Sequence, residues 1–428
     1  MRGVGCGLWL AISSIPIGAA EIADPEPEVA GITDVEGSGQ ESFGGPGSTS
    51  AQMQADEQIG AQDCRKGLAS HLRLYCDFKR LLHRENGIRF GVDYNTLLQG
   101  LTDSPGEDLA AGGVFRLFGT WTLLDPDAGR TGFLTFKAEN RHRLGTDLAP
   151  QALGGEFGYA GLTALPFSNA GTLLTNLYWE QSLAGDRFAY VAGLVDVTDY
   201  VAAYGLASPW TDFSNLAFST DPTVAVPDQG LGTALRWRLG DNYYLLAGLA
   251  DANGDPADPG DSFESFFGEG ELFKHVEFGW YGSWDSRYDD HVHLTLWQVD
   301  RRTEAGVPDG WGAALSSSHA VGERWLAFLR VGYGDGGGAL LERSISTGVA
   351  HRGGGRRGAF GLGVNWGRPN HDLFGADARD QYTLEAYYRL QLGTHTSITP
   401  DIQVVKDPAL DPGQDVVWVV GLRARVFF

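Results

Sequence analysis

The sequence predicts an all-β fold: a transmembrane antiparallel β-barrel of about sixteen strands, preceded by a short N-terminal amphipathic helix. First, from about residue 88 onward, segments of about ten residues alternate in polarity, which is the period of β-strands. Second, short and long connections alternate along the chain, as in barrels with short periplasmic turns. Third, no run of about eighteen apolar residues follows residue 20, so a membrane-spanning form requires a closed barrel.

Three segments precede the predicted barrel. Residues 1–20 hold an apolar run that ends in small residues, which is typical of a secretory signal peptide. Residues 21–63 are rich in acidic and small polar residues, a composition that predicts a disordered acidic leader. Residues 64–86 place apolar side chains at three- and four-residue steps, which predicts a periplasmic amphipathic helix. The barrel is then expected to occupy residues 87–428.

The strands follow from alternating segments bounded by turn residues. Residues 156–166 also look extended, but we assign them to a loop, because one more strand would place the two ends of the barrel on opposite sides. The predicted strands are 88–95, 112–124, 132–141, 173–183, 187–196, 230–239, 242–251, 272–284, 291–301, 310–319, 323–334, 342–351, 357–366, 380–392, 395–405 and 415–428.

The net charge and the spacing of the cysteines argue against some partners and some kinds of site. The net charge of −22 argues against a nucleic-acid partner, since phosphate binding needs the opposite sign. After removal of the signal peptide, only Cys64 and Cys76 remain. Their spacing fits no metal or redox motif, which leaves a structural disulfide or two free thiols.

The last residues of the chain alternate apolar and polar side chains and end on the aromatic Phe428. This ending resembles the sorting signal that the barrel assembly machinery of outer membranes recognises. Three C-terminal blocks are also similar to the closing hairpin of carbohydrate-selective (OprB-type) porins: residues 381–391 (QYTLEAYYRLQ), 399–404 (TPDIQV) and 421–428 (GLRARVFF). The resemblance implies a sixteen-stranded channel of the bacterial outer membrane that admits small sugars by diffusion past a constriction of arginine and acidic residues.

The strand register makes the inward face of the barrel polar and net positive. Its ten basic residues are Arg89, Arg116, Lys137, Arg141, Arg236, Arg238, Arg330, Arg389, Arg423 and Arg425, and its six acidic residues are Asp93, Glu139, Glu180, Glu277, Glu385 and Asp401. We expect some of them to form the constriction, because planar guanidinium and carboxylate groups hold pairs of sugar hydroxyls. Inward aromatic rings are candidates to stack on sugars, and the alternative is packing beneath an infolded loop. The candidate constriction and sugar-binding residues are Arg116, Tyr178, Glu180, Glu277, Trp297, Arg330, Glu385, Tyr387, Arg389, Arg423 and Arg425.

The connection 197–229 is far longer than its neighbours and contains large aromatic and proline residues. Loops of this length inside a compact structure tend to be functional. We therefore expect an infolded loop that narrows the pore, with a mobile surface loop as the alternative.

The sequence predicts no cofactor, metal site or enzymatic activity. His291 and His293 lack an evident third ligand, and the acidic cluster from Asp251 onward lacks the bidentate acid of a calcium loop, because Ser262 stands there. The expected partners are small sugars, outer-membrane lipids and the assembly machinery, with a monomer and a homotrimer both open. The alternatives to a porin are a barrel enzyme and an export or adhesion barrel.

Overall fold

The computed structural model describes residues 42–58, 72–102, 106–124, 131–322, 324–353 and 358–428. The predicted signal peptide, residues 21–41 and 59–63 of the predicted leader and residues 64–71 of the predicted helical segment lie outside the described residues. No described helix is both long enough and apolar enough to cross a membrane.

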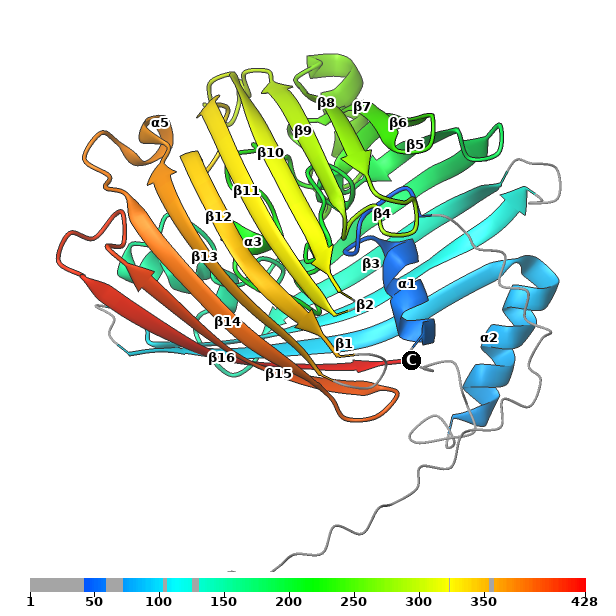
Figure 1. Cartoon of the computed structure of the whole chain (residues 1–428), viewed down its shortest axis with the longest axis horizontal. Helices are drawn as coiled ribbons and strands as arrows, with labels where there is room; N and C mark the ends of the chain where they lie inside the picture. The colour runs from blue at the N-terminus through cyan, green and yellow to red at the C-terminus, as the bar shows by residue number, and fades with distance from the viewer. Residues whose placement is uncertain (1–41, 59–71, 103–105, 125–130, 323, 354–357) are drawn as a thin grey trace, which may run out of the picture. The chain divides into compact units, whose positions relative to one another are not determined.

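Sixteen antiparallel strands form one closed sheet, in which β1 pairs with β16 and every other strand pairs with its neighbours in the chain (Figure 1). The predicted fold class and number of strands are confirmed, and residues 156–166 contain no strand. The strands are β1 (Ile88–Leu101), β2 (Leu109–Leu124), β3 (Gly132–Arg143), β4 (Gly171–Leu183), β5 (Phe188–Val195), β6 (Gly230–Leu239), β7 (Tyr243–Asp251), β8 (Leu272–Tyr281), β9 (His291–Val299), β10 (Gly310–Val321), β11 (Trp325–Gly336), β12 (Leu341–Arg352), β13 (Ala359–Pro369), β14 (Gln381–Gln391), β15 (Thr396–Lys406) and β16 (Val416–Phe427).

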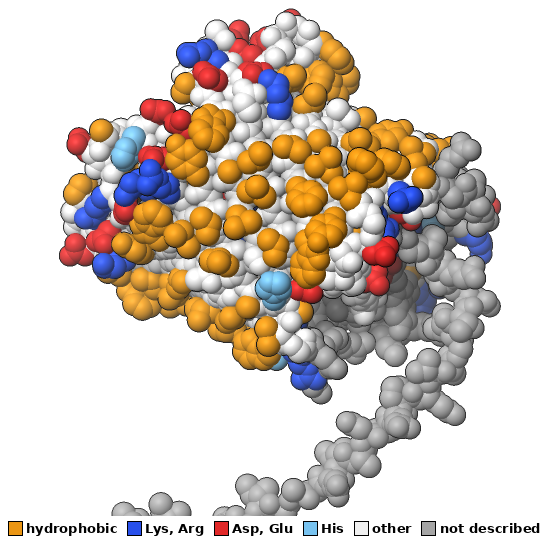
Figure 2. All heavy atoms as spheres, turned by 45° about the horizontal axis from the view of Figure 1, so that its top comes forward, with side chains coloured by type: hydrophobic (Ala, Val, Ile, Leu, Met, Phe, Trp, Pro, Cys, Tyr) orange, Lys and Arg blue, Asp and Glu red, His pale blue; other side chains and the backbone are white. Residues whose placement is uncertain are grey.

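The alternation of side chains puts apolar groups on the outer face and polar groups inside. In β9, Leu294 and Leu296 are 44% and 47% exposed, whereas Thr295 between them is fully buried. Figure 2 shows hydrophobic side chains spread over the outer face of the strands, with charged side chains gathered toward their ends. An outer wall of this kind suits contact with lipid.

The largest departure from the predicted boundaries is in β1, which continues to Leu101 and not only to residue 95. The inward residue Leu97 interrupts the alternation in the sequence. It is buried in a cluster with Val114, Phe167 and Trp210, because connecting loops pack against the inside of the wall here. An apolar inward position therefore marks loop packing and not the end of the strand.

The connections differ in length at the two ends of the barrel. We call the end with turns such as Ala184–Arg187 the short-turn end and the other the long-loop end. The C-terminus closes the barrel at the short-turn end, where the backbone N–H of Phe428 donates to the carbonyl of Val92 at 2.9 Å. The long-loop connections hold η3 (Pro150–Phe157), η4 (Val197–Asp199), α3 (Leu216–Ser219), α4 (Asp261–Glu264), η5 (Ser265–Glu269) and α5 (His371–Phe374).

Two helices precede the barrel. The predicted amphipathic helix is observed as α2 (Arg73–Asn86), and Gly87 ends it in a left-handed conformation with φ of 70°. Cys76 on this helix is disulfide-bonded, and Cys64 lies outside the described residues. The first helix, α1 (Thr49–Gln58), corrects the sequence analysis. Disorder is the wrong prediction for residues 42–58, because their backbone and polar groups find partners inside the barrel that composition does not reveal.

Candidate functional site

The connection between β5 and β6 folds into the barrel, as predicted, and we call residues 196–229 the inner loop. Its aromatic residues Tyr204, Phe213 and Phe218 are fully buried against Phe328 and Tyr387 of the wall. The apolar side chains of this loop pack against the wall, and polar side chains of the wall form hydrogen bonds with the loop backbone.

Two predicted site residues form hydrogen bonds with the same turn of the inner loop. Glu277 on β8 accepts a hydrogen bond from the backbone N–H of Ala202 at 2.9 Å. Arg330 on β11 donates to the carbonyl of Ala202 at 3.1 Å, and also to the carbonyls of Phe218 at 3.3 Å and of Thr220. Ala202 has φ of 52°, a left-handed conformation that a residue with a Cβ adopts at a cost of about 1–3 kcal/mol. The two wall residues therefore stabilise a strained turn.

Two inward residues of β14 hold the middle of the inner loop. The carboxylate of Glu385 accepts hydrogen bonds from the backbone N–H groups of Ser214 at 2.7 Å and Asn215 at 3.0 Å. Tyr387 donates its hydroxyl to Asp212 at 3.0 Å, and its ring meets Phe213 edge-on at 5.0 Å between centroids. The predicted carboxylate and aromatic ring lie beneath the loop.

Arginines near the closing seam hold the adjoining stretch. Arg423 on β16 donates to the carbonyl of Asp212 at 2.6 Å and to that of Pro209. Arg389 on β14 donates to the carbonyl of Thr211 at 3.3 Å. The closing strands therefore bring four of the predicted residues together, and all four contact residues 209–215 of the inner loop.

Arg116 and Arg425 share one carboxylate. Asp93 on β1 accepts from the Nε atoms of both arginines at 2.8 Å, and Arg425 also binds both oxygens of Asp56 on α1 at 2.8 Å. The guanidinium of Arg116 lies 3.7 Å from the ring centroid of Trp210. This network joins the wall, the inner loop and α1.

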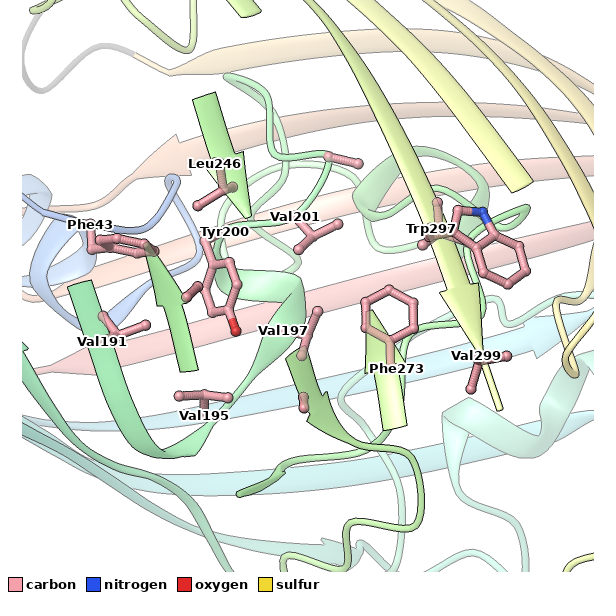
Figure 3. Close-up of a cluster of buried hydrophobic side chains, with 14 of the residues drawn as sticks. Phe43, Val191, Val195, Val197, Tyr200, Val201, Leu246, Phe273, Trp297 and Val299 are labelled. Carbon is pink, nitrogen blue, oxygen red and sulfur yellow. The ribbon is translucent and has the colours of Figure 1, made fainter. Parts of the chain in front are cut away.

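The remaining predicted residues lie on β4 and β9. Glu180 on β4 accepts a hydrogen bond from the backbone N–H of Phe43 at 2.8 Å. Tyr178 and Trp297 are buried in an apolar cluster, where the indole of Trp297 lies 6.4 Å from the ring of Phe273 (Figure 3).

A cavity of about 270 Å³ remains in the lumen between β3 and the inner loop. None of the eleven predicted residues lines it. On its wall, Lys137 lies 3.7 Å from Asp196 and 3.8 Å from Asp199, and Arg141 pairs with Glu139 at 2.6 Å. Its other polar lining residues include Gln151, Thr198, Thr220, Asp221, Asp228 and Gln229, and Trp210 adds an aromatic ring.

Two carboxyls on the inner loop carry raised pKa values. Burial raises the pKa of Asp199 to about 7, although the nearby ammonium of Lys137 opposes the shift. Burial also raises the pKa of Asp228, and the neighbouring carboxylate of Asp196 adds to the effect. The charge of this cavity therefore changes near neutral pH.

The sequence analysis placed Lys137, Glu139 and Arg141 on the inward face without assigning them to a site. It missed the acidic residues of the inner loop, because their approach to β3 depends on the path of the loop. The signal was present in Asp196 and Asp199, which open an exceptionally long connection. Among the described residues, no group of three or more His, Cys, Asp or Glu side chains is placed to hold a metal ion.

A closed barrel of sixteen antiparallel strands with a long loop inside its lumen defines a porin. The carbohydrate-selective porin, OprB family, matches residues 127–304 and 285–428, and the chain belongs to this family.

One solved structure shows the same fold, and two others are similar with lower scores. The high-pH structure of Pseudomonas putida OprB is 14% identical, covers 83% of this chain and 97% of its own, and has a TM-score of 0.66. The low-pH structure of that protein is 12% identical, covers 83% and 96%, and has a TM-score of 0.48. A mutant of the Rh. blastica porin is 14% identical, covers 80% and 100%, and has a TM-score of 0.49. No curated protein matches this chain.

Proposed function

We propose that this chain is a bacterial outer-membrane channel through which small neutral sugars diffuse passively, with the cavity beside the inner loop as its constriction. The observation that carries the proposal is the wall of this cavity, where Lys137 and Arg141 pair with acidic side chains and Trp210 adds an aromatic ring. Membership of the carbohydrate-selective family supports the class of solute.

The chemistry of the wall suits a neutral polyol. Ion pairs such as Arg141–Glu139 place donors and acceptors side by side, so that a sugar hydroxyl exchanges water for either partner. Because the opposite charges lie close together, no single position on the wall binds a solute strongly. Conduction requires weak binding of this kind.

We propose that five of the predicted wall residues act by positioning the inner loop and not by touching the solute at the constriction. Glu277, Arg330, Glu385, Arg389 and Arg423 direct their polar atoms at the loop backbone. Their removal is expected to change the pore by freeing the loop.

The test is conductance in planar bilayers, with glucose or maltose added to either side. The wild type is expected to conduct ions steadily and to show sugar-induced blocking. Arg141→Ala removes one charged hydrogen-bond donor, so half-block should require about tenfold more sugar. Trp210→Ala should raise the conductance, and Trp237→Ala on the outer face is the matched control that changes neither readout.

A barrel that does not conduct would contradict the proposal and favour a barrel enzyme or an export or adhesion barrel. Steady conductance without block by any sugar would retain a channel but refute sugar selectivity. Fractionation that finds the protein outside the outer membrane would refute the proposed location and its lipid and assembly partners.

A further inference from the structure

A second feature of the lumen lies at the short-turn end, where residues 42–58 enter the barrel; we call them the lumenal segment. Phe43 at its start is 3% exposed. Figure 3 shows the ring of Phe43 beside Tyr200 and Leu246, which belong to the inner loop and to β7. The segment comes from the N-terminal side of the barrel, yet it contacts strands from the middle of the chain.

Polar side chains of the wall hold the backbone of Phe43 on both sides. Its N–H donates to the carboxylate of Glu180 at 2.8 Å, and its carbonyl accepts from Arg236 at 3.0 Å and from the hydroxyl of Tyr288 at 3.4 Å. Arg287 donates to the carbonyl of Ser42 at 3.3 Å. One carboxylate, two guanidinium groups and one phenol thus converge on two consecutive peptide units, those on either side of Phe43.

Aromatic rings and charges surround the side chain of Phe43. The ring of Tyr200 meets it edge-on at 5.5 Å, and the guanidinium of Arg236 lies 5.0 Å from its centroid. A cavity of about 20 Å³ remains beside it. The residues that line this pocket are Phe43, Tyr200, Arg236, Tyr244, Leu246, Glu277, Trp284, Arg287 and Tyr288.

The pocket combines the two kinds of group that recognise a pyranose. A six-membered sugar ring has the outline of a phenyl ring and presents C–H faces to aromatic side chains, and its hydroxyls need donors and acceptors at the rim. Phe43 satisfies both requirements, since its ring fills the apolar interior while its backbone uses Glu180 and Arg236.

We propose that the pocket around Phe43 is a second sugar-binding site of the channel, at its short-turn end, and that Phe43 occupies it in competition with the sugar. The inference rests on the proposed function, because it takes neutral sugars as the solute. It adds a second site, lined by other residues than the constriction, and an occupant supplied by the chain itself.

The remaining contacts of the lumenal segment suit a displaceable occupant. Its far end is held by the ion pairs of Asp56 with Arg425 and of Glu57 with Arg89. Between the two ends, the hydroxyls of Thr49 and Ser50 are buried but bond to no described residue. Burying a hydroxyl without a partner costs about 1–3 kcal/mol, so the middle of the segment opposes its own insertion.

The experiment compares sugar block in bilayers for the full chain and three variants. Phe43→Ala removes the competing ring. If the pocket is free about a tenth of the time in the wild type, the half-blocking glucose concentration should fall about tenfold. Phe43→Ala combined with Glu180→Gln should lose this gain, because the rim loses its charged acceptor. Met53→Ala truncates a buried apolar residue of the same segment outside the pocket and is the matched control.

The outcomes separate this inference from the proposed function. A wild type that glucose blocks, with the same half-blocking concentration in Phe43→Ala, overturns the inference and leaves the proposed function intact. An equal gain in Met53→Ala also overturns it, because loosening the segment would then suffice without the pocket. Channels that conduct ions but are blocked by sugar in no variant refute both. Heat-modifiable mobility on gels verifies that each variant has folded.

Discussion

Replacing Arg330 by Met should release the first half of the inner loop from the wall. Arg330 is 2% exposed and donates to three loop carbonyls, those of Ala202 at 3.1 Å, of Phe218 at 3.3 Å and of Thr220, with Asp221 at 3.7 Å. A hydrogen bond from a charged donor contributes about 1.5–3 kcal/mol, so losing three costs about 4.5–9 kcal/mol. Relaxing the strained Ala202 turn returns about 1 kcal/mol or more. Taking about 3 kcal/mol as the net loss, local opening should become roughly 100-fold more frequent.

The assay is hydrogen exchange read by mass spectrometry on peptides from residues 197–229, with the protein in detergent. Arg389→Met is the matched control, since this arginine lies on the same face and makes one hydrogen bond of 3.3 Å to the loop. The control loses one such bond and should accelerate exchange only about tenfold, which corresponds to about 1.5 kcal/mol. Exchange in Arg330→Met within fivefold of the wild type, or equal acceleration in the two variants, would refute the anchoring role.

Three further predictions concern assembly, charge and the lumenal segment. Phe428→Ser should lower the yield of heat-modifiable barrel, because this residue ends the closing strand; an unchanged yield would contradict this. Asp199 loses its charge as the pH falls through about 7, so the reversal potential in a salt gradient should show a shift toward anion selectivity between pH 8 and 6. Asp199→Asn should abolish this shift. Lys137→Met should move the midpoint of the shift to higher pH. A Cβ added to Gly45 would lie 2.7 Å from the Cβ of Ala203, so a shift of the segment by about 1 Å would give the Cβ spacing of a disulfide. Cysteines at these two positions should therefore form a disulfide that lowers sugar block until it is reduced; block that does not depend on the redox state would argue against displacement.

The strands were predictable because the polarity of each strand residue indicates whether its side chain points to the outer or the inner face of the barrel. Leu294, Thr295 and Leu296 follow the outside–inside–outside alternation that their polarity dictates. What an inward side chain meets depends on the path of segments far away in the chain. Glu385 has the same inward register whether it faces water or the backbone N–H of Ser214, so alternation alone cannot separate the two.

Residues 42–58 were unpredictable for a related reason. Composition predicts disorder where a segment cannot bury enough apolar surface, but the lumenal segment is held mainly by partners that the barrel supplies. Arg425 binds Asp56, and Glu180 binds the backbone of Phe43. A backbone N–H has no signature in composition, so only the fold reveals this contact.

The path of the inner loop also reverses the charge that the wall alone would give the pore. The sequence analysis found a net positive inward face. Yet Arg330 and Arg423 direct their guanidinium groups at loop carbonyls, which leaves the solute to meet the groups that line the cavity. Two of these are basic and five are acidic, namely Lys137 and Arg141 against Glu139, Asp196, Asp199, Asp221 and Asp228. A passage of low dielectric favours ions opposite in sign to its fixed charge. The ionic preference of this channel therefore follows from the loop, and we expect it to be for cations above neutral pH, where Asp199 is ionised.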